Sequence, residues 1–225
     1  MPRMPRVVIP EVPHHITQRG NRRENVFWTE ADRRRYLELV LAYGRERGLH
    51  VWAYCLMTNH VHFVAIPDQA DSLANTFKPV DMRYTQHVNR VHGLGGRLWQ
   101  GRFFSCPLDD EHLWAAVRYV ERNPVRVGLV RRAEAYPWSS AAAHCGRRKD
   151  TLVEGNLEVR AVVDDWSAWL REEDDEAMVE TLRRRTRTGR PAGDSVFVAR
   201  LEALCQRILS PRKAGRPKKT KKTTK

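Results

Sequence analysis

The chain has 225 residues, and its 40 Lys and Arg against 27 Asp and Glu give a net charge of +13 and a pI near 10.1. This length allows one ordinary domain with an appendage, and the charge favours a polyanionic partner. No run of about eighteen apolar residues exists and no secretory signal is recognisable, so we expect a cytoplasmic, nucleoid-associated protein without a membrane partner.

The N-terminal part predicts alternating strands and helices. His14–Arg19 alternates in polarity and predicts the first strand, followed by a basic loop. Thr29 caps a helix that a glycine ends, and the apolar run Leu49–Pro67, with Thr58-Asn59 as its polar break, predicts two strands joined by a tight turn.

Two histidines lie two residues apart in the second of these strands. Side chains at i and i+2 of a strand leave the same face, so His60 and His62 should point into one pocket, while Val61 and Phe63 pack into the core. The alternative is a pair of polar positions on a solvated sheet face, because a His-x-His string alone is not specific.

The segments that follow complete a sheet. A helical stripe across Asp68–His92 predicts a second helix broken by Pro79, and Arg102–Pro107 predicts a further strand. The order of elements resembles a ferredoxin-like α+β fold, which is an antiparallel sheet with helices on one face.

A third helix carries a tyrosine. Asp109 supplies its N-cap, the helix should cover Asp110–Arg122, and Pro124 should end it. Tyr119 and Asn123 are four residues apart, which places a phenol and a carboxamide on one face.

If that face covers the histidine pair, a divalent cation can be held by His60, His62 and Asn123, with Tyr119 beside it. Three protein ligands with open positions suit Lewis-acid activation of a phosphate. A hard, redox-silent ion that accepts imidazole is required, which favours Mg²⁺ or Mn²⁺.

Several motifs together resemble one family. They are the histidine pair flanking a hydrophobic residue, the string Tyr-Val-Glu-Arg-Asn-Pro-Val-Arg-Val-Gly-Leu-Val at 119–130, and the segments 13–21, 98–103 and 136–140. The chain resembles the REP-associated tyrosine transposases of the His-hydrophobic-His endonucleases. The resemblance predicts a catalytic domain over residues 6–145.

The resemblance implies a metal-dependent single-stranded DNA endonuclease and strand transferase. Tyr119 would attack the scissile phosphate to leave a 5′-phosphotyrosine and a free 3′-hydroxyl, with His60, His62 and Asn123 completing the catalytic set. The implied substrate is single-stranded or hairpin DNA of the repetitive extragenic palindromic (REP) kind, and the long C-terminal extension favours a monomer. The competing hypothesis is a non-catalytic REP-hairpin binding or regulatory protein, which would form no covalent adduct.

Basic, polar and aromatic residues outside the catalytic set are candidate DNA contacts. Arginines of the first loop can bind phosphates. The segment after the glycine-rich loop at 93–96 combines aromatic surface for base stacking with hydrogen-bond donors. The alternatives are a solvated loop and, for the tryptophan, a place in the core. The candidates are Arg19, Arg22, Arg23, Trp99, Gln100, Arg102, Arg126, Arg216 and Lys218.

The composition changes after the predicted catalytic domain. Residues 146–210 should form a helical extension, in which an acidic stretch at 164–180 is either a shield for the basic DNA surface or a solvated helical face. Residues 211–225 form a basic tail, expected to be disordered without DNA, whose Arg216-Pro217-Lys218 core resembles an AT-hook or is simply polybasic.

Overall fold

A four-stranded antiparallel sheet lies at the centre of the fold. The computed structural model describes residues 5–153 and 163–210, so residues 1–4, the tail at 211–225 and the segment 154–162 lie outside the description. The strands are β1 (His14–Arg19), β2 (Leu49–Met57), β3 (His60–Pro67) and β4 (Phe104–Pro107), in the spatial order β2-β3-β1-β4. The predicted strands are confirmed, although β4 begins two residues later than expected.

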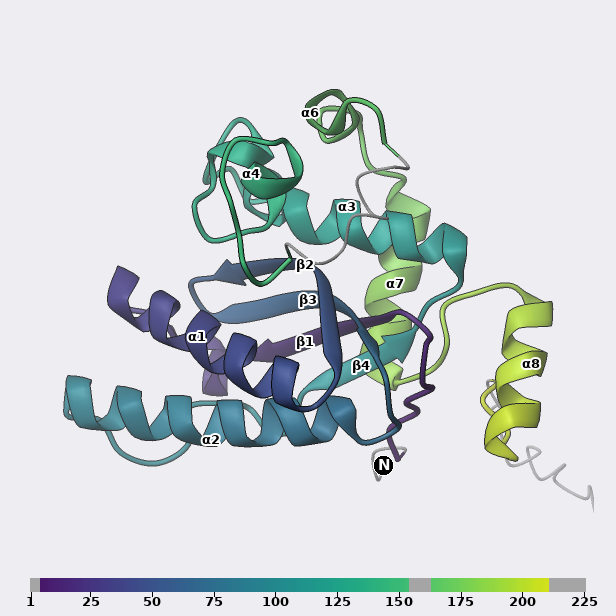
Figure 1. The fold of residues 1–225 in the computed structure, drawn as a ribbon, viewed down its shortest axis with the longest axis horizontal. Coiled ribbons are helices and arrows are strands. Elements are labelled where there is room, and N and C mark those ends of the chain that lie inside the picture. The colour runs from purple at the N-terminus through teal and green to yellow at the C-terminus, as the bar shows by residue number, and fades with distance from the viewer. Residues whose placement is uncertain (1–4, 154–162, 211–225) are drawn as a thin grey trace, which may run out of the picture.

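Helices cover both faces of this sheet (Figure 1). Helices α1 (Glu30–Glu46) and α2 (Ser72–His92) cover one face, and α3 (Asp110–Arg126) and α7 (Glu176–Thr188) cover the other. The ferredoxin-like α+β class is confirmed, but the expectation of helices on one face is corrected because α3 and the C-terminal extension bury the second face. The shorter elements are η1 (Asn21–Arg23), η2 (Ala133–Ala135), α4 (Ala141–His144), α6 (Trp166–Trp169) and α8 (Ser195–Cys205).

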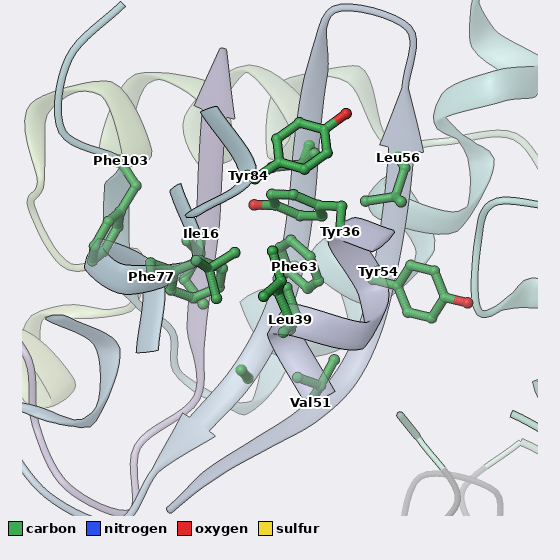
Figure 2. Packing of buried hydrophobic residues seen from close by; sticks show 14 of the residues in the cluster. Ile16, Tyr36, Leu39, Val51, Tyr54, Leu56, Phe63, Phe77, Tyr84 and Phe103 are labelled. Atoms are coloured by element: carbon green, nitrogen blue, oxygen red, sulfur yellow. The ribbon is translucent and has the colours of Figure 1, made fainter. Parts of the chain in front are cut away.

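Two apolar cores follow from strand alternation. Val61 and Phe63 face the core under α1 and α2, as predicted, and Figure 2 shows Phe63 among the aromatic rings of this cluster. Val64 faces the opposite core under α3. His60 and His62 alternate with Val61 and Phe63, so both histidines lie on the α3 side of the sheet.

Both predictions based on prolines are wrong. Helix α2 continues through Pro79 to His92, and α3 continues through Pro124 to Arg126. An internal proline costs a helix roughly 3 kcal/mol, but the buried stripe of α2 continues on both sides of Pro79, and Pro124 is itself buried. Asn123 therefore lies inside α3 and not at its end.

No helix among residues 5–153 and 163–210 has the length and hydropathy that crossing a bilayer requires.

The buried carboxyl group of Asp81 on α2 should make the stability of the fold depend on pH. Gln18 Nε2 donates to Asp81 Oδ2 at 3.1 Å, whereas Asp81 Oδ1 is buried without a partner in the described chain. Burial raises the pKa of Asp81 from 3.8 to about 8. Between these two values the folded state holds a proton that the unfolded state has lost, so the free energy of unfolding should fall as pH rises from about 4 to about 8.

The Asp81→Asn variant tests this expectation. It should flatten the pH dependence and be more stable than wild type at about pH 8, by on the order of 1–3 kcal/mol, in urea unfolding followed by circular dichroism. Asp110→Asn, at an exposed carboxylate on α3, should keep the wild-type pH profile. An Asp81→Asn profile parallel to wild type between about pH 5 and pH 8 would contradict the assignment.

Candidate active site

A cavity of about 570 Å³ lies between the sheet and helices α3 and α7. Strands β1 and β3 supply its floor, and the two helices supply the opposite wall. The structure brings together the four predicted catalytic residues, which all line this cavity: His60, His62, Tyr119 and Asn123. Their catalytic roles remain predictions.

His60 has one ring nitrogen committed to a neighbour. Its Nδ1 lies 2.6 Å from Asn59 Oδ1, and Asn59 Nδ2 donates to the Arg23 carbonyl at 2.9 Å, which fixes the orientation of that amide. Because an amide oxygen only accepts, His60 Nδ1 carries the hydrogen and Nε2 keeps its lone pair. Burial, and then the charge of Arg19, lower the pKa of His60 to about 4, so the ring is neutral near neutral pH.

His62 is buried against two other rings. Its ring is nearly parallel to that of His15, with centroids 5.2 Å apart, and it meets His60 edge to face at 5.0 Å. Its Nδ1 lies 3.0 Å from His15 Nε2, while its Nε2 is buried without a partner among the described residues. Burial, followed by the neighbouring histidines, holds the pKa of His62 well below 6.5.

Tyr119 lies on the same cavity as Asn123 and contacts one histidine of the predicted pair, His62. Its ring meets His62 edge to face with centroids 5.5 Å apart, and Arg183 Nε donates to its hydroxyl at 3.4 Å. The guanidinium groups of Arg126 and Arg183 lie 5.8 and 5.4 Å from the ring centroid. The centroid of the His15 ring lies 5.9 Å from that of Tyr119, so the phenol lies beside the imidazoles of His62 and His15 and two cations of its own chain.

The donor atoms of this cavity fit a divalent cation. The described residues contain no cluster of three or more His, Cys, Asp or Glu that could hold a metal, so the predicted ligand set depends on the carboxamide of Asn123. His60 and His62 are neutral, and the buried Nε2 of His62 is unpartnered, as a nitrogen ligand requires. Asn123 is itself 6% exposed and lines the same cavity.

The candidate DNA contacts fall into two groups. Arg19, Gln100 and Arg126 line the cavity. Trp99 is buried, and its ring lies 5.9 Å from that of Tyr36, so its position agrees with the packing alternative and not with base stacking.

The remaining candidates lie elsewhere. Arg22 and Arg23 are exposed in η1 with backbone φ of 51° and 64°, a left-handed geometry that turns the chain sharply after β1. Arg102 is exposed and borders a small pocket together with Arg187 of α7. Arg216, Lys218 and the AT-hook-like segment lie outside the described residues.

The acidic stretch of the extension contacts α3. Asp174 accepts from Arg122 at 3.1 Å and from Arg126 at 2.7 Å, and it lies 3.7 Å from Arg118. These arginines are spaced four residues apart, and the Asp174 side chain is 5% exposed. The Asp174 carboxylate therefore neutralises a basic helix face, and it is not part of a solvated one.

Among the cavity residues that escaped prediction are His15, Arg183 and Thr186. His15 lines the cavity with Thr17 and Arg19, and this alternation along β1 was a usable signal because β1 pairs with the histidine strand. Arg183 and Thr186 come from α7, and nothing in the sequence links that helix to residues more than a hundred positions earlier.

Two solved structures are similar to this chain. A solved REP-associated tyrosine transposase bound to a REP hairpin has a TM-score of 0.53 and 19% identity, covering 68% of this chain and 90% of that one, which shows a shared fold. A structure described as "a putative transposase from Deinococcus radiodurans R1" has a TM-score of 0.38 and 17% identity, covering 54% and 97% of the two chains. No curated protein matches the chain.

The family comparison covers just over half of the sequence. The model for IS200-like transposases matches residues 9–123, a span that includes all four predicted catalytic residues and ends at Asn123. The chain belongs to the IS200-like transposase family.

Proposed function

We propose that this protein is a metal-dependent endonuclease and strand transferase that acts on single-stranded DNA at REP-type hairpins. The observation that carries the proposal is the 5.5 Å contact between the Tyr119 and His62 rings in a cavity where His62 Nε2 has no partner among the described residues. Membership of the transposase family supports DNA strand chemistry. A protein that only bound hairpins would need neither this contact nor two neutral imidazoles.

Tyr119 is the proposed nucleophile. Its hydroxyl oxygen bonds to the scissile phosphorus as the bond to the 3′ oxygen breaks, and the phenolic proton leaves while the departing oxygen gains one. The products are a 5′-phosphotyrosine and a free 3′-hydroxyl. Attack by another 3′-hydroxyl reverses the step and joins strands, and no nucleotide is consumed because the phosphodiester energy is conserved.

His60, His62 and Asn123 are the proposed ligands of Mg²⁺ or Mn²⁺. The bound ion would supply Lewis-acid activation of the scissile phosphate. Both imidazoles are neutral near neutral pH, so no proton has to leave either ring before a cation binds.

The proposed substrate rests on charge and on the structural neighbour. The net charge of +13 favours nucleic acid, and the neighbour of the same fold is bound to a REP hairpin. We assign phosphate and base contacts to Arg19, Gln100 and Arg126 at the cavity. The tail with Arg216 and Lys218 would add non-specific affinity.

We also propose a cytoplasmic, nucleoid-associated monomer. Tyr119 and His62 meet within one chain, so no second copy is needed to complete the site. The proposed divisions are a catalytic domain at 6–145, a helical extension at 146–210 and a basic tail at 211–225.

The experiment that tests this function detects a covalent intermediate. The purified protein is incubated with labelled single-stranded hairpins from its own genome and Mn²⁺ or Mg²⁺, then separated by denaturing electrophoresis. A labelled band at the mass of protein plus DNA, lost on chelation, is the expected result. Tight hairpin binding with no such band on any hairpin would favour the non-catalytic binding protein.

Arg183 offers a second test of the cavity. Because its guanidinium donates to the Tyr119 hydroxyl and adds positive charge where a phosphate must bind, Arg183→Gln should slow adduct formation by about 10-fold. Arg184→Gln removes the same charge from an exposed neighbour that does not line the cavity, so its rate should match wild type. Equal rates for the two variants would show that Arg183 acts only through overall charge.

A further inference from the structure

A buried chain of hydrogen bonds connects the extension to the metal-ligand candidate His62. Thr186 Oγ1 donates to the Leu182 carbonyl at 2.8 Å, and His15 Nδ1 lies 2.7 Å from Thr186 Oγ1. His15 Nε2 lies 3.0 Å from His62 Nδ1. Thr186, His15 and His62 are 2%, 1% and 5% exposed, so water does not compete for these bonds.

The positions of the hydrogens in this series of hydrogen bonds follow from the Leu182 carbonyl at its end. A backbone carbonyl only accepts, so the single hydroxyl hydrogen of Thr186 is used on Leu182. Thr186 Oγ1 must then accept from His15 Nδ1–H. A neutral imidazole carries one N–H, so His15 Nε2 accepts from His62 Nδ1–H, which leaves the lone pair of His62 on Nε2.

A fourth group is compatible with this assignment. Cys106 Sγ lies 3.2 Å from Thr186 Oγ1, and a hydroxyl oxygen has two lone pairs. The oxygen can accept from both His15 and the thiol, so Cys106 does not require the hydroxyl hydrogen to leave Leu182.

We propose that Thr186 and His15 are positioning residues that hold His62 in the Nδ1–H tautomer and so present its Nε2 to the metal ion. The inference rests on the proposed metal site. If the Thr186 oxygen is removed, His15 is free to place its hydrogen on Nε2 and donate to His62 Nδ1, which puts the other hydrogen on His62 Nε2 and blocks coordination. Helix α7 is thereby a part of the active site, although it lies outside the segment that matches the family.

The test compares Thr186→Val with Thr186→Ser. Valine keeps the volume and removes the acceptor, whereas serine keeps the hydroxyl. Nitrogen-15 imidazole spectra of the metal-free protein report the tautomer of His62, whose signals a His62→Gln spectrum assigns. Calorimetry with Mn²⁺ alone reports affinity, and thermal unfolding confirms that each variant is folded.

We expect the Nδ1–H tautomer of His62 in wild type and in Thr186→Ser. Thr186→Val should populate the Nε2–H tautomer and bind Mn²⁺ about 10- to 100-fold more weakly. Thr188→Val, which removes an exposed hydroxyl from the same helix, should behave as wild type.

Three outcomes overturn the inference: a wild-type His62 with its hydrogen on Nε2, a wild-type chain that binds no Mn²⁺, or a Thr186→Val chain with unchanged tautomer and affinity. Failure of the nuclease proposal looks different. A wild-type chain with the expected tautomer and Mn²⁺ affinity that forms no DNA adduct would reject the catalytic function and leave the positioning role in place.

Discussion

The Tyr119→Phe variant is expected to form no covalent adduct with a hairpin that it still binds. The substitution removes only the hydroxyl oxygen, so the ring keeps its contacts with His62, Arg126 and Arg183. Removal of a catalytic nucleophile costs at least about 10³-fold, which puts the adduct below detection in a labelled gel. Hairpin affinity, measured by fluorescence anisotropy at fixed salt, should change by less than about 3-fold.

A matched substitution separates the nucleophile from general damage. Tyr43 lies on α1 and packs against the core on the opposite face of the sheet. Tyr43→Phe should give the wild-type yield of adduct. If Tyr119→Phe still forms the adduct, another residue is the nucleophile and the tyrosine mechanism fails.

Glu121→Ala is expected to cause the largest loss of stability. Glu121 is fully buried on α3, where its carboxylate accepts from Ser140 at 2.5 Å, His144 at 2.6 Å and Trp166 at 2.7 Å. These bonds join α3 to α4 and α6. Alanine removes the carboxylate that three buried donors share, which should lower the free energy of unfolding by about 3–5 kcal/mol and Tm by roughly 10 °C.

Thermal and urea unfolding followed by circular dichroism measure this loss. Glu180→Ala removes an exposed carboxylate from helix α7 and should change the free energy of unfolding by less than about 0.5 kcal/mol. Glu121→Gln should fall between the two, because an amide keeps the shape and one acceptor oxygen. A Tm for Glu121→Ala equal to that of Glu180→Ala would mean that the three donors find other partners.

Local pattern was sufficient for the sheet and for the residue faces that bring the four predicted catalytic residues to one cavity. The strand bounds of β1 to β3, the cap of α1 at Thr29 and the shared face of His60 and His62 follow from alternation, capping and turn chemistry within a few residues. The spacing of Tyr119 and Asn123 likewise predicted one helix face. Such signals depend only on neighbours in the chain, so they can be read without a structure.

Local pattern was insufficient where packing opposed propensity. Pro79 and Pro124 predicted helix ends, but burial on both sides of Pro79, and of Pro124 itself, outweighs the lost hydrogen bond. A tryptophan such as Trp99 can stack on a DNA base or pack in a core, and only its burial beside the Tyr36 ring in the folded chain decides between them.

The sequence by itself determined the α+β class, the histidine pair and the tyrosine helix, because each follows from patterns that repeat within a few residues. Only the tertiary structure decided that Thr186 reaches His15, that Arg183 reaches Tyr119 and that Asp174 neutralises the arginines of α3. These contacts join residues 48 to 171 positions apart. No periodicity in the chain encodes such distances, since they arise from the packing of α7 and its preceding loop against a sheet and helix that are already formed.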